Sequence, residues 1–147
     1  MELSEGSQGR EFGLLLGSLS RAWRSKLTQR LKSLGVSAPA FIALGQLSRA
    51  ERGLIQQELA ERVGVEGPTL VRLLDRMEAD GWVRRQPSES DRRQNVLVLT
   101  EKALPALDEM RKVAGALHTE ALSVATEAEL RTAMDLFRKL LARLEEI

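Results

Sequence analysis

Residues 56–75 read QQELAERVGVEGPTLVRLLD, and the pattern of this stretch decides the fold. Its apolar residues occur at the spacing of two short helices that pack across a tight turn: Leu59, Val63, Val65, Leu70 and Leu73. Ala60 is small enough for two helix backbones to approach closely, and Gly64 can adopt the positive φ of a sharp turn. Pro68 suits the first turn of a second helix, where its missing N–H is not needed. The stretch therefore predicts a helix-turn-helix, a motif whose second helix can enter a DNA major groove.

The second helix of this motif has two distinct faces. Its apolar stripe is formed by Leu70, Leu73, Leu74 and Met77. The opposite face carries Pro68, Thr69, Arg72 and Arg76. Arginine can bind guanine O6 and N7 with two hydrogen bonds, and threonine can bind a base or a phosphate. The alternative is the solvated face of an ordinary amphipathic helix.

A β-hairpin is predicted directly after the helix. Gly81 is a candidate for the residue that ends the helix. Residues 82–85 and 96–100 have the sequence pattern of two short strands, and the polar loop 87–95 separates them. A helix-turn-helix followed at once by a hairpin is a winged helix.

The predicted tip of the wing carries Asp91, Arg92 and Arg93. A cationic tip at this place can reach the adjacent minor groove, whose negative potential attracts arginine. We expect Asp91 to hold an arginine in place through a charge-assisted hydrogen bond. Without the preceding helix, a solvated charged turn would be the better interpretation.

The run from Leu54 to Lys102 resembles the MarR/SlyA family of bacterial transcription regulators. The resemblance is carried by LAERVGVEGPTLVRLLDRMEADGWVRR at 59–85, by SDRRQNVLVLT at 90–100 and by TEKA at 100–103. The segments PTLVR at 68–72 and AWR at 22–24 are similar to the SlyA branch. The family implies a homodimeric winged-helix repressor or activator, often released from DNA by small aromatic or phenolic anions.

The resemblance also implies roles for single residues. It marks Arg72 as the main base contact and the pair of Asp91 and Arg93 as the functional part of the wing. We expect Arg84, Arg85 and Arg92 to contact phosphates, and so to supply affinity and salt dependence rather than sequence choice.

The composition narrows the function further. The net charge is only +1, although residues 21–34 contain five cations and no acid, so attraction to DNA would come from local patches. The absence of cysteine excludes disulfides, thiolate metal sites and cysteine redox sensing, and one histidine makes a metal site unexpected. No nucleophile with a paired base and no phosphate-binding glycine loop is present, so we predict neither an enzyme nor a cofactor. No apolar run approaches the ~20 residues of a membrane span and no signal peptide is visible, which favours the cytoplasm.

The rest of the chain is predicted to be helical. After a frayed polar start, MELSEGSQGRE, helices are expected over 9–34 and 38–50, with 54–55 as a third strand beside the wing. Thr100 is a candidate N-cap for the next helix, and Thr126 with Glu129 forms a capping box for the last. The fold class is mainly α with a small β-hairpin wing. The predicted domains are 1–36, an N-terminal dimerisation helix; 37–100, the winged helix-turn-helix; and 101–147, the C-terminal dimerisation helices.

The long first and last helices carry more apolar surface than one small winged helix can cover. We therefore expect the terminal helices of two copies to interlace in a two-fold homodimer on double-stranded DNA, which would read a near-palindromic site. The alternative is a monomer in which these helices form their own bundle.

A pocket for a small aromatic carboxylate or phenolic effector is expected where the dimerisation helices meet the winged helix. Such a ligand needs an apolar wall and one arginine. The candidate lining is Trp23, Arg24, Leu27, Arg30, Phe41 and Leu44. The alternative is that these are core positions, with the arginines facing solvent or phosphate.

A second class of function is a winged-helix protein-interaction module without sequence-specific DNA binding. Such a module would expose aromatic residues or methionine on the second motif helix. The exposed face here is expected to present Thr69, Arg72 and Arg76, which favours DNA.

Overall fold

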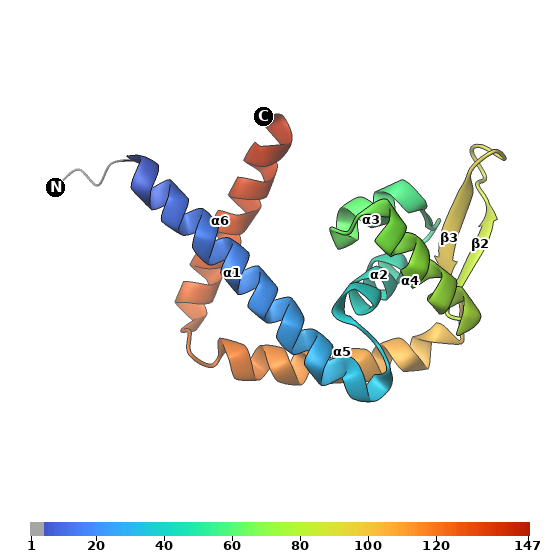
Figure 1. Ribbon diagram of the computed structural model, residues 1–147, viewed down its shortest axis with the longest axis horizontal. Helices are drawn as coiled ribbons and strands as arrows, with labels where there is room; N and C mark the ends of the chain where they lie inside the picture. Colours follow the sequence, from blue (N-terminus) through green and yellow to red (C-terminus); the bar gives the residue numbers. More distant parts are fainter. Residues whose placement is uncertain (1–4) are drawn as a thin grey trace. The chain divides into compact units, whose positions relative to one another are not determined.

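The computed structural model describes residues 5–147 and has the predicted fold class, mainly helical with one small antiparallel sheet (Figure 1). The chain divides into two compact units, one ending at Ala114 and the other comprising Gly115–Ile147. The elements are, in order, α1 Glu5–Leu31, the 3-10 helix η1 Lys32–Leu34, α2 Ala38–Arg49, β1 Leu54–Ile55, α3 Gln56–Val63, α4 Gly67–Ala79, β2 Val83–Pro87, β3 Asn95–Leu99, α5 Ala103–Leu122 and α6 Glu127–Glu146.

Helix α1 differs from the prediction at both ends. It begins at Glu5 rather than at residue 9, so the part of the polar start that the structure describes is helical rather than frayed; residues 1–4 lie outside the described residues. A pattern of apolar residues finds only the part of a helix that carries the stripe. At its other end α1 gives way to η1, which Gly35 closes with a φ of +69°.

The helix-turn-helix has the predicted construction. Helix α3 ends at Val63 and is capped by Gly64, whose φ is +72° and whose N–H donates to the carbonyl of Ala60 over 2.9 Å. Pro68 lies in the first turn of α4. After α4, Gly81 has a φ of +77° and donates to the carbonyl of Glu78, while Trp82 donates to that of Met77, both over 2.9 Å. This pair of bonds is the Schellman arrangement that glycine permits at a helix end.

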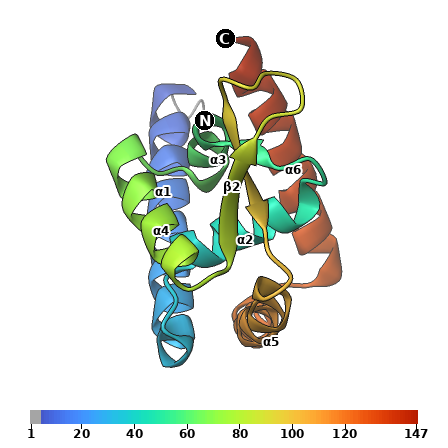
Figure 2. The same cartoon turned by 90° about the vertical axis from the view of Figure 1, so that its right-hand side faces the viewer.

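The sheet has the order β1-β3-β2 and is antiparallel throughout. Leu54 pairs with Leu97, which confirms the predicted third strand beside the wing. Strand β2 runs further and starts later than predicted, with Val83 opposite Leu99 and Pro87 opposite Asn95. Figure 2 shows β2 lying alongside β3, with the loop of the hairpin beyond them.

The core of the first unit is apolar, and among residues 6–147 no polar or charged residue is buried. It draws on α1 to α5 and on all three strands. Its largest fully buried side chains are Leu31, Leu44, Leu59, Leu70, Leu74, Met77, Leu97, Leu107, Met110 and Val63. The C-terminal half of α1 is therefore packed into the winged helix rather than separate from it.

The last two helices begin differently from each other. Thr100 does not cap α5 as predicted: its hydroxyl donates to the carbonyl of Gly81 over 2.6 Å, and the helix begins at Ala103. In the second unit, the predicted capping box of α6 is confirmed. The N–H of Thr126 donates to Glu129 over 2.8 Å, and the N–H of Glu129 donates back to the Thr126 hydroxyl over 3.2 Å. Over the described residues, no helix is both long enough and apolar enough to cross a membrane.

Candidate nucleic-acid interface

The predicted DNA-facing side of α4 is exposed. Leu70, Leu74 and Met77 are buried on one side of the helix and Leu73 is half-buried. The residues exposed to solvent include Pro68, Thr69, Arg72 and Arg76. Because the apolar stripe anchors one face, the opposite face presents a hydroxyl and two guanidinium groups outward.

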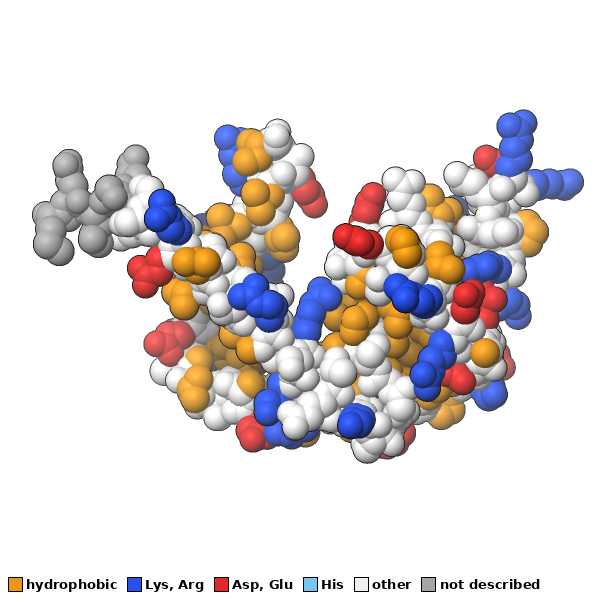
Figure 3. All heavy atoms as spheres, viewed as in Figure 1, with side chains coloured by type: hydrophobic (Ala, Val, Ile, Leu, Met, Phe, Trp, Pro, Cys, Tyr) orange, Lys and Arg blue, Asp and Glu red, His pale blue; other side chains and the backbone are white. Residues whose placement is uncertain are grey.

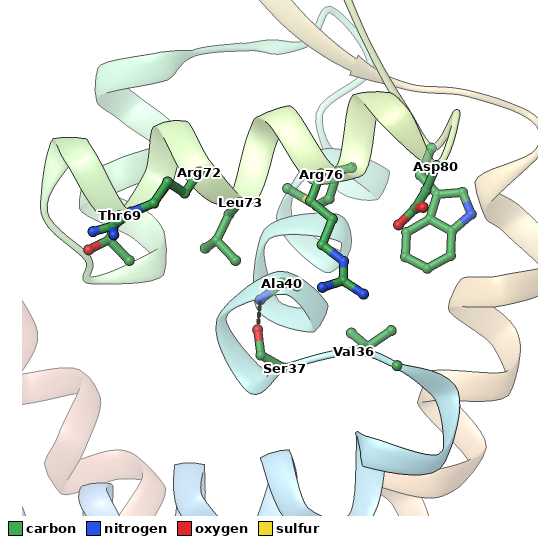
Figure 4. A pocket seen from close by; sticks show the side chains of 11 residues that line it. Val36, Ser37, Ala40, Thr69, Arg72, Leu73, Arg76 and Asp80 are labelled. Carbon is green, nitrogen blue, oxygen red and sulfur yellow. Dashed lines mark hydrogen bonds between the residues drawn. The ribbon is translucent and has the colours of Figure 1, made fainter.

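A cavity of about 320 Å³ lies between α4 and the segment that joins η1 to α2. Figure 4 shows Arg76 reaching from α4 toward Val36, while the guanidinium of Arg72 lies near Thr69. The cavity is lined by Gly35, Val36, Ser37, Ala40, Thr69, Arg72, Leu73, Arg76, Met77, Asp80 and Trp82. Two of the predicted DNA-contacting arginines thus also line a cavity that has apolar walls.

At the wing tip, Asp91 shapes the turn. Its Oδ1 accepts a hydrogen bond from the backbone N–H of Arg93 over 3.0 Å, and its carbonyl accepts one from Gln94 over 3.0 Å. The expected bond from Asp91 to an arginine side chain is absent among residues 5–147. The short carboxylate of an aspartate readily accepts a hydrogen bond from the backbone N–H two residues ahead, as it does here.

The tip arginines Arg92 and Arg93 are exposed, and Figure 3 shows cationic side chains projecting at the end of the hairpin. Four other predicted contacts, Arg72, Arg76, Arg84 and Arg85, are exposed as well. Of these six guanidinium groups, only that of Arg85 forms an ion pair or hydrogen bond with a residue that the structure describes. Its Nε lies 2.9 Å from Oε1 of Glu78 on α4.

The six residues predicted to line an effector pocket do not surround the cavity beside α4. Leu27 and Leu44 are 3% and 0% exposed, so they fill the core. Trp23, Arg30 and Phe41 are half-buried. Arg24 donates from Nη2 to the carbonyl of Val63 over 3.1 Å.

Several cavity residues were missing from that prediction. Val36 and Ser37 belong to the connection after Gly35, and Trp82 follows the glycine that ends α4. The aromatic residue directly after a helix-ending glycine was the available signal. That Trp82 and Val36 line the same cavity depends on how α4 packs, which helical periodicity does not describe.

No group of three His, Asp or Glu side chains within residues 5–147 is placed to hold a metal ion.

Comparison with known proteins gives the family. A model described as MarR family matches residues 34–94. The crystal structure of the transcriptional regulator PA3341 is 40% identical in sequence, has a TM-score of 0.83, and covers 92% of this chain and 99% of its own. The chain belongs to the MarR family of transcriptional regulators. The predicted family is thereby confirmed, and so is the expectation that the chain is not an enzyme.

Two further structures of regulators are similar over most of the chain. The regulator BldR from Sulfolobus solfataricus is 25% identical with a TM-score of 0.86, and covers 96% of this chain and 99% of its own. A mutant of MarR from E. coli in complex with operator DNA is 27% identical with a TM-score of 0.76. That alignment covers 89% of this chain and 94% of the MarR chain.

Proposed function

We propose that this MarR-family chain is a homodimeric regulator that binds a near-palindromic operator, with α4 in the major groove and the wing in the flanking minor groove. The observation that carries the proposal is a set of exposed guanidinium groups without partners among residues 5–147, on α4 and on the tip of the wing. The complex of the E. coli MarR mutant with operator DNA supports the same use of the fold.

On α4, Arg72 is the base-reading residue, with Thr69 and Pro68 beside it and Arg76 one turn further along. The guanidinium of Arg72 has no partner among residues 5–147, so it can donate two parallel hydrogen bonds to guanine without first breaking a salt bridge. The buried residues Leu70 and Leu74 hold this face outward.

On the wing, Arg93 enters the minor groove, and Asp91 gives the turn its shape. Arg92 and Arg84 contact phosphates. Arg85 belongs to the same surface, but its ion pair with Glu78 must loosen before it can bind a phosphate.

The homodimer is supported by apolar side chains that one chain leaves uncovered. On α1, Leu14, Leu15 and Leu19 are each more than half exposed, and on α6 so are Leu141 and Leu144. Apolar surface concentrated in this way marks an interaction site. Two-fold pairing of such helices would set the recognition helices of two copies about one turn of DNA apart.

A small aromatic carboxylate or phenolic anion would fit the cavity beside α4 better than the region around Trp23. The cavity combines the apolar walls of Val36, Leu73 and Trp82 with the cations Arg72 and Arg76. An anion bound there would occupy Arg72 and would compete directly with DNA.

The experiment is a fluorescence-anisotropy titration of DNA from upstream of the protein's own gene, against scrambled DNA, over a salt series. Selective binding of two chains per site supports the proposal.

Arg72→Ala should weaken operator binding by about 1–3 kcal/mol and relax selectivity. Arg84→Ala should weaken binding to both DNAs and flatten the slope of log K against log salt by about one. Salicylate should raise the Kd for the operator. Equal, weak binding of the wild type to both DNAs would favour the protein-interaction module.

A further inference from the structure

Arg24 joins α1 to the turn of the helix-turn-helix. Its Nη2 donates to the carbonyl oxygen of Val63 over 3.1 Å, across 39 positions of sequence. Val63 is the last residue of α3. A Cβ placed on Gly64 would lie 3.4 Å from the same nitrogen, so the guanidinium rests against the turn itself.

The carbonyl that Arg24 binds belongs to Val63, at the C-terminal end of α3. The last carbonyls of an α-helix have no intrahelical donor and carry partial negative charge. Here the N–H groups of Gly64 and Val65 both donate to Ala60, over 2.9 and 3.3 Å. The guanidinium therefore supplies both a hydrogen bond and a favourable charge at the place where α3 stops.

The position of this turn controls the start of α4. Only residues 64–66 separate the two helices, and the N-cap of α4, Glu66, makes no side-chain capping bond. Arg24 is half-buried, and three residues further along α1 Leu27 is in the core. Arg24 thus extends a firmly packed part of α1 to the segment from which α4 begins.

We propose that Arg24 is a positioning residue for DNA recognition, which holds the α3–α4 turn so that Thr69 and Arg72 project at the angle needed to read bases. The inference rests on the DNA-binding function proposed above. Base hydrogen bonds require close alignment, whereas phosphate attraction tolerates a tilted helix. Loss of Arg24 should therefore reduce selectivity without removing a phosphate contact.

The test compares Arg24→Ala with Arg21→Ala, which removes the same charge from α1 one turn earlier. Arg21 is exposed, and its hydrogen-bond partner is the local hydroxyl of Ser18, 3.3 Å away. Binding to operator and to scrambled DNA is measured by anisotropy over a salt series, at a temperature where thermal melts show each variant folded. Hydrogen exchange then measures how fast the backbone amides of Gly64 and Val65 exchange with solvent.

For Arg24→Ala we expect about tenfold weaker operator binding, as for the loss of a hydrogen bond to a charged group. Affinity for scrambled DNA and the slope of log K against log salt should stay as in the wild type, and the two turn amides should exchange faster. Arg21→Ala should keep the wild-type selectivity. Arg24→Lys, which retains the cation and a donor, should lie between wild type and alanine, and it carries the comparison if the alanine variant does not fold.

Three results would overturn the inference. One is wild-type selectivity in Arg24→Ala, or in Arg24→Lys should alanine not fold. Another is equal weakening on both DNAs with a slope flatter by about 0.9, which would make Arg24 a phosphate contact. The third is a wild-type protein that does not distinguish the two DNAs, which removes the proposed function itself. The ratio of the wild-type protein's affinities for operator and scrambled DNA is enough to identify this third case.

Discussion

The Nε atom of Arg85 lies 2.9 Å from Oε1 of Glu78, so an ion pair joins strand β2 of the wing to helix α4. The two side chains are 38% and 34% exposed, yet Oε1 itself is buried and accepts no aligned hydrogen bond from the residues described. The charges are therefore close, but the N–H group does not point at the oxygen. This arrangement ties up one of the arginines that the wing could offer to DNA.

Glu78→Gln should release Arg85 for DNA. Because the pair is partly exposed, its loss should cost at most about 1 kcal/mol of unfolding free energy. Binding to operator and to scrambled DNA should both strengthen, and the salt slope should steepen by about 0.9 if Arg85 reaches a phosphate. Anisotropy over a salt series measures this. The double variant with Arg85→Ala is the control, and an unchanged slope in Glu78→Gln would mean that Arg85 does not reach the DNA.

Asp91 should act through an oxygen acceptor rather than through its charge. Its Oδ1 accepts from the N–H of Arg93 over 3.0 Å, and asparagine keeps such an acceptor while alanine does not. Asp91→Asn should therefore bind the operator much as the wild type does. Asp91→Ala should lose about 1 kcal/mol of binding as the turn loosens. Equal losses in the two variants would show that the negative charge is needed.

Gly53 should be intolerant of a side chain, whereas Gly45 should accept one. Gly53 has a φ of +77°, and a Cβ there would lie 2.6 Å from the carbonyl oxygen of Leu97. Gly53→Ala should lower the free energy of unfolding by more than about 1 kcal/mol. Gly45 lies inside α2 with nothing within 4 Å of its Cβ position, so Gly45→Ala should raise it by up to about 1 kcal/mol. Chemical denaturation of both variants tests the opposite signs.

The pKa of Glu129 should lie below that of an ordinary glutamate, because the backbone N–H of Thr126 and then its hydroxyl hydrogen-bond to the carboxylate. A lowered pKa in the folded state means that the stabilisation is present above the pKa of the unfolded glutamate. It is lost as the pH falls through the lower, folded value. Thr126→Val keeps the N–H and removes the hydroxyl, so NMR titration should find the pKa of Glu129 raised only part of the way toward that of an ordinary glutamate. An unaltered pKa would mean that the hydroxyl contributes nothing.

The exposed leucines of α1 should be needed for assembly. Leu15 is 62% exposed in the single chain, so a charge at this position should not disturb the chain's own core. Leu15→Glu should keep the helical circular dichroism and shift sedimentation toward the monomer, because a glutamate cannot be buried in an apolar interface at low cost. Operator binding should fall with the dimer. Unchanged sedimentation would mean that this part of α1 does not belong to the dimer interface.

Much of the fold was predictable because its signals are local. The positive φ of Gly64, Pro68 in the first turn of α4 and the capping box at Thr126 each depend on a few neighbouring residues. Where a longer-range signal was needed the prediction was wrong or incomplete. Thr100 donates to Gly81 instead of capping a helix. Leu27 and Leu44 are buried in the core of the single chain, and their predicted part in an effector pocket stays a prediction.

The sequence by itself determined that this protein has a winged helix. It also determined which face of α4 is apolar and which residues form the cationic wing tip. These features depend on helix and strand periodicity and on turn chemistry, which are properties of residues close together in the sequence. Only the tertiary structure decided what several charged groups bind. Arg24 meets the carbonyl of Val63, Arg85 meets Glu78, and Arg72 and Arg76 share a cavity with Val36. These partners lie on different elements, and their distances follow from how the core packs those elements together, which no single segment of the chain encodes.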